Sequence, residues 1–276
     1  MAINSINTND GSFVALQNLA ATNAFLRDTQ DRISTGRKIN SSKDNGAIWA
    51  IAQNLRAGSQ SINAVKQSLD RAQSTTDVAL TAGANVSDLL IQMKEKALAA
   101  ADTALDSSSR TALNDEFKVL RDTLKKTVDN AEFNGTNMIK AAGTGMQALA
   151  NIAGTNIITV SAQNLSLGSA IVTVTATESF NTAATASASL TKVNNSIVAV
   201  NKALATMGAQ YKAIALHNTF MAKLQDNLDA GVGNLVDADL GRESARLQSL
   251  QSRQQLGVQA SSIANQSTSV LLGLFR

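Results

Sequence analysis

Apolar residues recur along most of this chain in alternating steps of three and four. The longest series starts at Ile48 and ends at Ala100, and Thr76 is its only polar member. A repeat sustained over about fifty residues predicts a long helix in a coiled-coil-like seam rather than a short amphipathic helix. Small residues fill several of its positions, so a partner helix can approach closely.

Two further series predict the partners of this helix. One extends from Leu113 to Ala131, and the other extends from Leu190 to Leu235. Because each carries an apolar stripe, we expect the three helices to bundle with one another. Weaker series near the two ends contain Leu16, Leu19, Leu26 and Ile33 in the first part, and Leu247, Leu256, Ile263, Val270 and Leu274 in the last.

The middle of the chain has a different composition. Glu178 is the only charged residue between Ala141 and Thr191. Two stretches rich in β-branched residues, TNIITVSA and SAIVTVTAT, predict short strands, and the Asn-Gly pair of FNGTNMI predicts a turn.

The predicted fold class is therefore mainly α. It is a long coiled-coil-like helical bundle formed by the N- and C-terminal segments, with a small β-containing central insertion. The expected divisions are terminal helices at 1–44 and 236–276, a helical stem at 45–140 and 182–235, and an insertion at 141–181.

Composition supports long helices and excludes several classes of protein. The 276 residues include no proline, against roughly fourteen at average usage, and only 3% are aromatic. Proline breaks helix interiors, so its absence permits very long helices. Without cysteine there is neither a disulfide nor a thiolate zinc site. A net charge of +3 gives no argument for nucleic acid, and no stretch has the length and apolarity of a membrane span.

Catalytic and metal-binding motifs are also missing. The one histidine, His217, has no histidine or cysteine partner, and DADLGRE at 237–243 lacks the spacing of a calcium loop. The cationic run from Arg32 to Lys43 has no interleaved aromatic residue that would suit nucleic acid. We therefore expect no enzyme activity, no cofactor and no metal.

Two non-enzymatic classes fit the helical pattern: a self-assembling structural protein and a signalling helical bundle of the chemoreceptor kind. The signalling class predicts one continuous hairpin with a charged tip. This chain instead has an uncharged insertion at its midpoint and polar breaks about forty residues from each end. That symmetry favours the structural class.

Both ends of the chain resemble bacterial flagellin. The stretch RISTGRKINSSKDNGAIWAIAQNLRA follows the N-terminal signature of that family, and RQQLGVQASSIANQSTSVLLGLFR follows the C-terminal one. The FNG turn and the short middle resemble those of compact alphaproteobacterial flagellins. The N-terminal matches are Arg32, Ser34, Gly36, Ile39, Asn40, Lys43, Asp44, Ala50, Ile51 and Ala52.

The resemblance implies a secreted structural subunit of the flagellar filament. The chain ends would pair as the inner core and polymerise through the terminal apolar residues given above, while the stem forms the outer core. Export through the flagellar type III apparatus with a chaperone, and contacts with cap and hook-junction proteins, are implied as well. A hook–filament junction protein is the nearest alternative. The connector between the two layers would contain Arg32, Gly36, Arg37, Asn40, Lys43 and Asp44.

Two features set this chain apart within that resemblance. The hydroxyl-rich insertion suits O-linked sugar, with candidates at Thr173, Thr175, Thr177 and Ser179. In the segment that an innate immune receptor recognises in many flagellins, Gln92 and Lys96 stand where an arginine and a leucine are typical. We therefore do not expect that receptor to detect this chain in the way it detects many flagellins.

Overall fold

The computed structural model describes residues 8–273, with side chains described as far as residue 266. The chain divides into two compact units, one from Met1–Ala57 and Asn227–Arg276 and the other from Gly58–Asp226. Helices α2 (Gly46–Ala100) and α4 (Ala183–Val236) contribute residues to both units. Each unit therefore has its own packing and is described separately.

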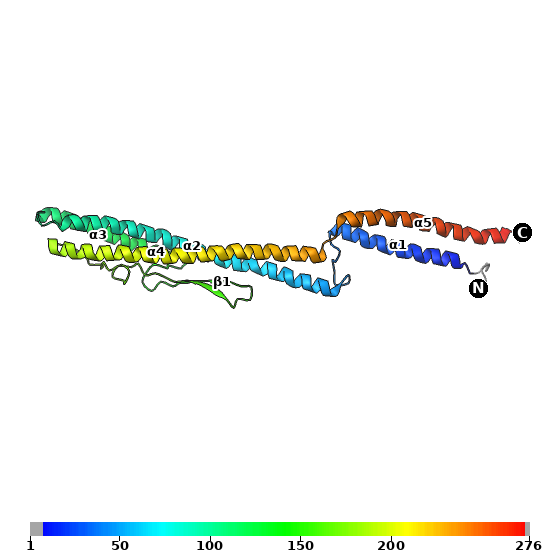
Figure 1. The fold of residues 1–276 in the computed structure, drawn as a ribbon, viewed down its shortest axis with the longest axis horizontal. Helices are drawn as coiled ribbons and strands as arrows, with labels where there is room; N and C mark the ends of the chain where they lie inside the picture. Colours follow the sequence, from blue (N-terminus) through cyan, green and yellow to red (C-terminus); the bar gives the residue numbers. More distant parts are fainter. Residues whose placement is uncertain (1–7, 274–276) are drawn as a thin grey trace. The chain divides into compact units, whose positions relative to one another are not determined.

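The smaller unit contains a pair of helices from opposite ends of the chain. Helix α1 (Asp10–Thr35) lies along α5 (Leu240–Gly273), as Figure 1 shows in blue and red. Asn9 caps α1, since its side-chain oxygen accepts a hydrogen bond from Ser12 N at 3.0 Å. Gly36 ends the helix in a left-handed conformation with φ of 69°, which favours glycine. The two ends of the sequence thus form one antiparallel helix pair.

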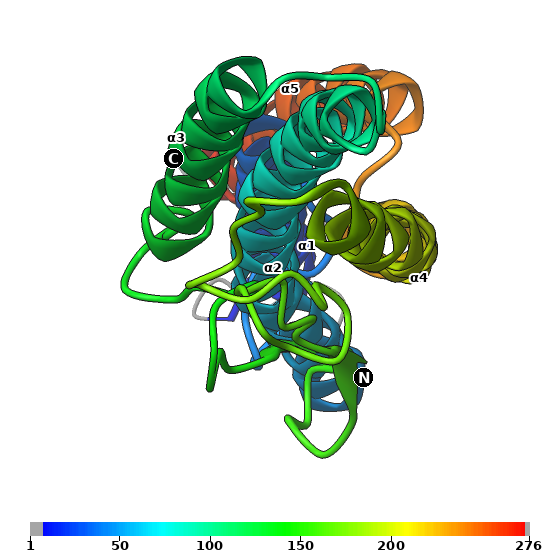
Figure 2. The same cartoon turned by 90° about the vertical axis from the view of Figure 1, so that its left-hand side faces the viewer.

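The larger unit contains the predicted bundle. Its parts of α2 and α4 lie side by side with α3 (Ser107–Asp129), as Figures 1 and 2 show. Every position of the predicted α2 series from Ile62 to Ala100 is buried, including Thr76, whose hydroxyl donates to the Ala72 carbonyl. Val193, Val200, Met207 and Ile214 are fully buried on α4. The predicted bundle is therefore confirmed over this range.

Polar side chains fix the antiparallel register of α2 and α4. Gln225 donates to Asn63 at 3.1 Å, and Asn218 donates to Asp70 at 2.6 Å. Seven residues separate the two partners on each helix, so the two contacts repeat along one face. Repeated polar contacts beside an apolar seam specify how the helices of a bundle align with one another.

The insertion contains two short strands and much irregular backbone. Strands β1 (Met146–Leu149) and β2 (Ile157–Val160) pair antiparallel, with Met146 opposite Val160. The helices also hold the hairpin: Ser68 of α2 accepts from Leu149 N at 3.1 Å, and His217 Nε2 lies 2.8 Å from the Ala150 carbonyl oxygen. The sole histidine therefore positions a backbone carbonyl.

One strand prediction is confirmed and one is wrong. Strand β2 lies within TNIITVSA, but residues 169–177 form no strand. Their Val172 and Val174 side chains are buried, while Thr173 N donates to Ser196 Oγ of α4 at 2.9 Å. A helix side chain thus satisfies the backbone group that a neighbouring strand would have taken. The predicted Asn-Gly turn is present, with Asn134 at φ 49° and Gly135 at φ 77°.

The burial pattern predicts that the stem folds without the terminal helices. A fragment of residues 45–235 is expected to be helical, soluble and monomeric, because its three seams bury one another within a single chain. Circular dichroism and analytical ultracentrifugation provide the check. A random-coil spectrum would contradict this expectation.

Candidate interaction surface on the terminal helices

The contact between α1 and α5 uses mainly small and polar side chains. Shielded positions on α1 are Ser12, Ala15, Leu19, Thr22, Leu26, Thr29 and Ile33, and those on α5 are Glu243, Leu247, Leu250, Gln254, Gly257, Ser261 and Ala264. Polar contacts cross the pair: Gln254 donates to Asn23 at 2.7 Å, and Ser12 donates to Asn265 at 2.8 Å. Only five of these positions carry large apolar side chains, namely Leu19, Leu26, Ile33, Leu247 and Leu250, so the apolar area that the pair removes from water is modest.

Large apolar side chains point to solvent on both helices. We call them together the apolar face of the terminal helices, a set that projects from more than one side of each helix: Phe13, Val14, Leu16 and Phe25 on α1, and Leu240, Leu256, Val258 and Ile263 on α5. Each is between 50% and 66% exposed. The stem also exposes large apolar residues, among them Val198 and Leu216. Groups of exposed apolar side chains of this kind commonly mark contacts with other molecules.

The predicted interface residues occupy three environments. Leu26 is buried, whereas Leu19, Ile33 and Leu247 are half-buried in the contact between the helices. Leu16, Leu256 and Ile263 belong to the exposed apolar face. The Val270 side chain and Leu274 lie outside the described residues.

Only three of the eight members of this face, Leu16, Leu256 and Ile263, were among the predicted interface residues, and Val14, Phe25 and Val258 carried no signal in the pattern. They lie off the heptad positions that were followed along each helix. A search for large apolar residues outside the seam would have found them, because a helix that packs against a single partner needs no apolar residues on its other sides.

The connector between α1 and α2 is held by the backbone that precedes α5. Lys38 N donates to the Val236 carbonyl at 2.7 Å, and Ala238 N donates to the Gly36 carbonyl at 2.9 Å. A small apolar cluster anchors the same region, in which Ile39 packs with Val232, Val236 and Trp49, the only tryptophan of the chain. The connector is therefore an ordered segment with its own core.

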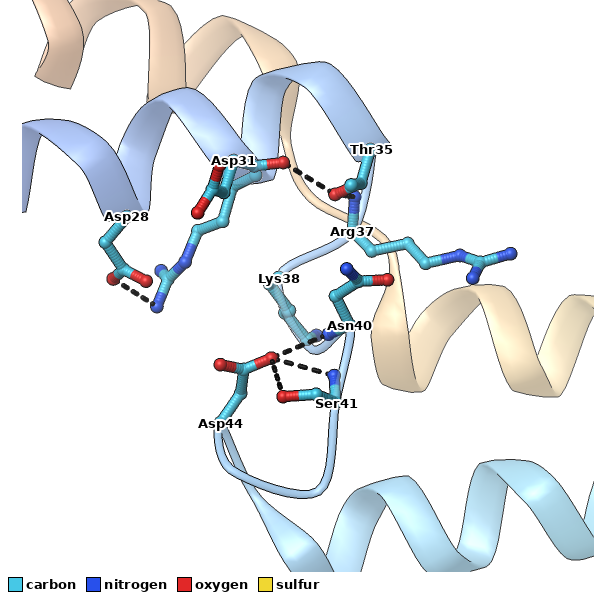
Figure 3. Close-up of a pocket in the computed structure, with 9 residues that line it drawn as sticks. Asp28, Asp31, Thr35, Arg37, Lys38, Asn40, Ser41 and Asp44 are labelled. Carbon is cyan, nitrogen blue, oxygen red and sulfur yellow. Dashed lines mark hydrogen bonds and ion pairs between the residues drawn. The ribbon is translucent and has the colours of Figure 1, made fainter.

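Asp44 closes the connector into a tight turn. Its Oδ2 accepts hydrogen bonds from the backbone N–H groups of Asn40 and Ser41, both at 2.9 Å (Figure 3). These bonds, that from Ser41 first, lower the pKa of the Asp44 carboxyl, and the charge of Arg32 adds to the effect. The carboxylate thus supplies acceptors that the short turn lacks.

The other predicted connector residues differ in their partners. Arg32 binds Asp28 at 3.1 Å and faces Glu243 at 3.4 Å. Arg37 and Lys43 are exposed, and within the described residues neither side chain forms an ion pair. Figure 3 shows the Arg37 side chain pointing away from Asp28, Asp31 and Asp44. Two cations of the connector are therefore available for other contacts.

The hydroxyl candidates of the insertion differ in accessibility. The Thr173 hydroxyl donates to the Lys192 carbonyl at 3.0 Å, and the Thr175 hydroxyl donates to Glu178 Oε2 at 2.9 Å. Thr177 and Ser179 are exposed, and neither hydroxyl has a partner among the described residues.

Glu178 fastens the end of the insertion to the stem. Its carboxylate receives Lys192 Nζ at 2.8 and 2.9 Å and the Ser189 hydroxyl at 2.9 Å, while its carbonyl accepts from Arg121 at 2.8 Å. Burial by itself would raise the pKa of this carboxyl. The hydrogen bonds from Lys192, Ser189 and Thr175 outweigh that effect, so the pKa is lowered.

This arrangement predicts a pH dependence of stability. A carboxyl whose pKa is lower in the folded state stabilises the fold above its unfolded pKa, about 4.3 for glutamate, and that contribution is lost as pH falls through the folded value. Glu178→Gln is therefore expected to lower the free energy of unfolding at pH 7 and to show a smaller deficit at about pH 3.

Denaturant unfolding at both pH values measures this effect. The exposed Glu132→Gln provides the matched control. A Glu178→Gln deficit that stays the same at both pH values would contradict the role given to the charge.

Within the described part of the chain, no three His, Cys, Asp or Glu side chains form a group able to hold a metal ion. The same residues include no helix long and apolar enough to cross a membrane. Gln92 and Lys96 line an open groove between α2 and α3, where Lys96 pairs with Glu116 at 2.9 Å.

Helices paired from opposite chain ends, an exposed apolar face and a separate stem define a structural protein rather than an enzyme. The family model described as the bacterial flagellin N-terminal helical region matches residues 6–144, and the model described as the bacterial flagellin C-terminal helical region matches residues 190–275. The chain belongs to the bacterial flagellin family.

Full-length relatives agree with this assignment. Flagellin FljM and flagellin FljK of Caulobacter vibrioides are 54% and 53% identical to this chain, over all of both sequences in each case. A Brucella melitensis flagellin is 33% identical, over 99% of each chain. The protein is thus a structural subunit of the extracellular flagellar filament, where flagellins form a homopolymer, and its relatives are alphaproteobacterial.

Solved structures show the same fold at lower identity. The Bacillus cereus flagellin aligns with a TM-score of 0.51 at 21% identity, covering 56% of this chain and 88% of that one. A putative flagellar hook-associated protein from Vibrio parahaemolyticus aligns with a TM-score of 0.58 at 16% identity, covering 70% of this chain and all of that one. The fold is therefore shared by both kinds of protein.

Proposed function

We propose that the apolar face of the terminal helices is the surface through which copies of this chain polymerise. The observation that carries the proposal is that α1 and α5 shield few large apolar residues between them and leave Phe13, Leu16, Phe25, Leu256 and Ile263 exposed. Contacts with neighbouring copies would remove these side chains from water and supply stabilisation that the isolated pair lacks.

In this proposal the residues divide into two layers. The terminal segments 1–44 and 236–276 form the inner core, and the stem segments 45–140 and 182–235 form the outer core. Arg32, Gly36, Arg37, Asn40, Lys43 and Asp44 connect the layers. The turn closed by Asp44 and the cluster around Trp49 support an ordered connector.

Further partners follow from membership in the family. We propose export by the flagellar type III apparatus with a chaperone, and contacts with cap and hook-junction proteins at the filament ends. An exposed apolar face also gives a reason for a chaperone, since unpaired terminal helices would otherwise associate before export.

Sedimentation with filament seeds tests the assembly proposal. The full chain is expected to elongate seeds, whereas the fragment of residues 45–235, which lacks both terminal segments, is expected to stay in the supernatant. Elongation by that fragment would contradict polymerisation through the terminal helices.

We also propose O-glycosylation of the insertion, and the hydrogen bonds favour Thr177 and Ser179 over Thr173 and Thr175. A hydroxyl that donates within the fold must lose that bond to carry a sugar, whereas an exposed free hydroxyl loses nothing. Peptide mapping of native filaments by mass spectrometry is expected to find added mass at these two residues. Filament subunits with the mass of the bare chain would contradict glycosylation.

A further inference from the structure

The chain contains two Asn-Gly pairs, Asn45-Gly46 at the start of α2 and Asn134-Gly135 in the turn that follows α3. Such pairs have a spontaneous chemistry of their own. The backbone nitrogen of the glycine can attack the side-chain carbon Cγ of the asparagine, because glycine has no side chain that obstructs the approach. The structure places the two pairs in different environments, so their rates of reaction are expected to differ.

The first pair is tied to a helix. The side-chain oxygen Oδ1 of Asn45 accepts a hydrogen bond from Ile48 N at 3.1 Å, and its backbone carbonyl accepts one from Trp49 N at 3.0 Å. Gly46 is the first residue of α2. Asn45 is therefore the N-cap of this helix, and its amide cannot turn toward Gly46 N without breaking the cap.

The second pair has no such ties. Asn134 and Gly135 are exposed and adopt φ of 49° and 77°. Within the described residues, neither the side-chain amide of Asn134 nor the backbone N–H of Gly135 has a hydrogen-bond partner. The carbon and the nitrogen that would react are thus both open to water.

The turn around Asn134 is also the easier of the two segments to open. It is closed by two backbone hydrogen bonds, from Phe133 N to the Thr136 carbonyl and from Thr136 N to the Phe133 carbonyl, both at 3.0 Å. Opening the first turn of α2 would instead disturb Ile48 and Trp49, which pack on the apolar cluster of the connector. Segments with few packed side chains open locally at a lower cost in free energy than packed helices do.

We propose that Asn134 deamidates spontaneously in the folded protein and that Asn45 is protected. The Gly135 nitrogen loses its proton and forms a bond to Asn134 Cγ, and the side-chain nitrogen leaves as ammonia. One water molecule then opens the resulting succinimide ring at either carbonyl, which gives aspartate or β-linked isoaspartate. The reaction consumes water and releases ammonia without an enzyme or a cofactor, so it can continue in a filament outside the cell.

The isoaspartate product changes the turn. Its backbone is longer by one carbon, so a two-residue turn can no longer keep both hydrogen bonds between Phe133 and Thr136. Asn137 connects this turn to α3: its Nδ2 donates to the Val128 carbonyl at 2.8 Å, and its Oδ1 accepts from Ile139 N at 2.9 Å. The reaction therefore makes the end of α3 a place where chemical change accumulates as the subunit ages.

Peptide mapping by mass spectrometry follows both asparagines in the full-length chain during incubation at mildly alkaline pH. In the native protein Asn134 is expected to convert at least about fivefold faster than Asn45, which is the factor that a single N-cap contact implies. In denaturant the two are expected to convert at similar rates, because the reacting residues are the same. Equal native rates, faster conversion of Asn45, or native protection of both would overturn the proposal.

A variant tests the assignment to this turn. Asn134→Gly removes the reactive amide and keeps a residue that tolerates positive φ. After long incubation the unaltered chain is expected to contain isoaspartate that a protein isoaspartyl methyltransferase labels, whereas the variant is expected to contain far less. Equal labelling of the two chains would place the reaction elsewhere and overturn the assignment to Asn134.

Discussion

Replacing Leu256 and Ile263 together with aspartate is expected to abolish elongation of filament seeds while leaving the monomer's thermal unfolding nearly unchanged. In the single chain these side chains are 64% and 66% exposed, so aspartate meets water there. If neighbouring copies cover them, each aspartate becomes a buried charge without a partner. That penalty exceeds what a lost apolar contact costs, because an ion must give up its hydration.

A matched variant separates the effect of burying two charges from the effect of adding two charges to α5. Gln259→Asp with Ser262→Asp adds the same two charges to exposed polar positions of α5, and we expect it to elongate seeds far better. Sedimentation and differential scanning calorimetry provide the two readouts. Equal elongation by the Leu256 and Ile263 variant and by the unaltered chain would contradict a role for these side chains in assembly.

The largest expected loss of stability comes from Phe117→Ala in the stem. Phe117 and Phe180 are both fully buried, and their ring centroids lie 5.1 Å apart in an edge-to-face arrangement. Removing the Phe117 ring leaves a cavity and takes away the surface on which Phe180 packs. Substitutions of this kind cost about 3–5 kcal/mol.

The loss should also loosen the insertion. Phe180 N also donates to Asn114 Oδ1 at 2.8 Å, so both the ring and the backbone of Phe180 hold the end of the insertion against α3. Val119→Ala, at a position 65% exposed on the same helix, is expected to change the free energy of unfolding by less than about 0.5 kcal/mol. Guanidinium unfolding compares the two variants, and a similar small effect of both would contradict this account of the core.

The stem was predictable because its sequence repeats one signal many times. Each position from Ile62 to Ala100 adds to a single heptad pattern, and burial of that face needs only helices from the same chain. The Asn-Gly turn was predictable for a local reason, since both residues adopt positive φ readily.

The insertion was less predictable because its backbone partners are distant in the sequence. Val172 and Val174 have strand-like propensity, yet Thr173 bonds to Ser196 and Lys192 of α4 rather than to a strand. Strand β1, MQAL, carries a weak signal and forms because β2 pairs with it. Neither outcome can be read from local composition.

The candidate interaction surface was predictable in location but not in membership. The heptad count found Leu16, Leu256 and Ile263, but it treated them as equivalent to Leu26, which is buried between α1 and α5. Which face of each helix meets its partner depends on packing geometry.

Cysteine accessibility in monomer and filament tests the central claim most directly. Chains with Leu16→Cys or Val258→Cys, and with Thr177→Cys as the exposed control in the insertion, can each be copolymerised at low ratio with the unaltered chain, which has no cysteine of its own. All three are expected to react with a maleimide as monomers. In filaments Leu16→Cys and Val258→Cys should be protected, whereas Thr177→Cys should still react. Reaction of Leu16→Cys and Val258→Cys in filaments at their monomer rates would contradict assembly through the apolar face of the terminal helices.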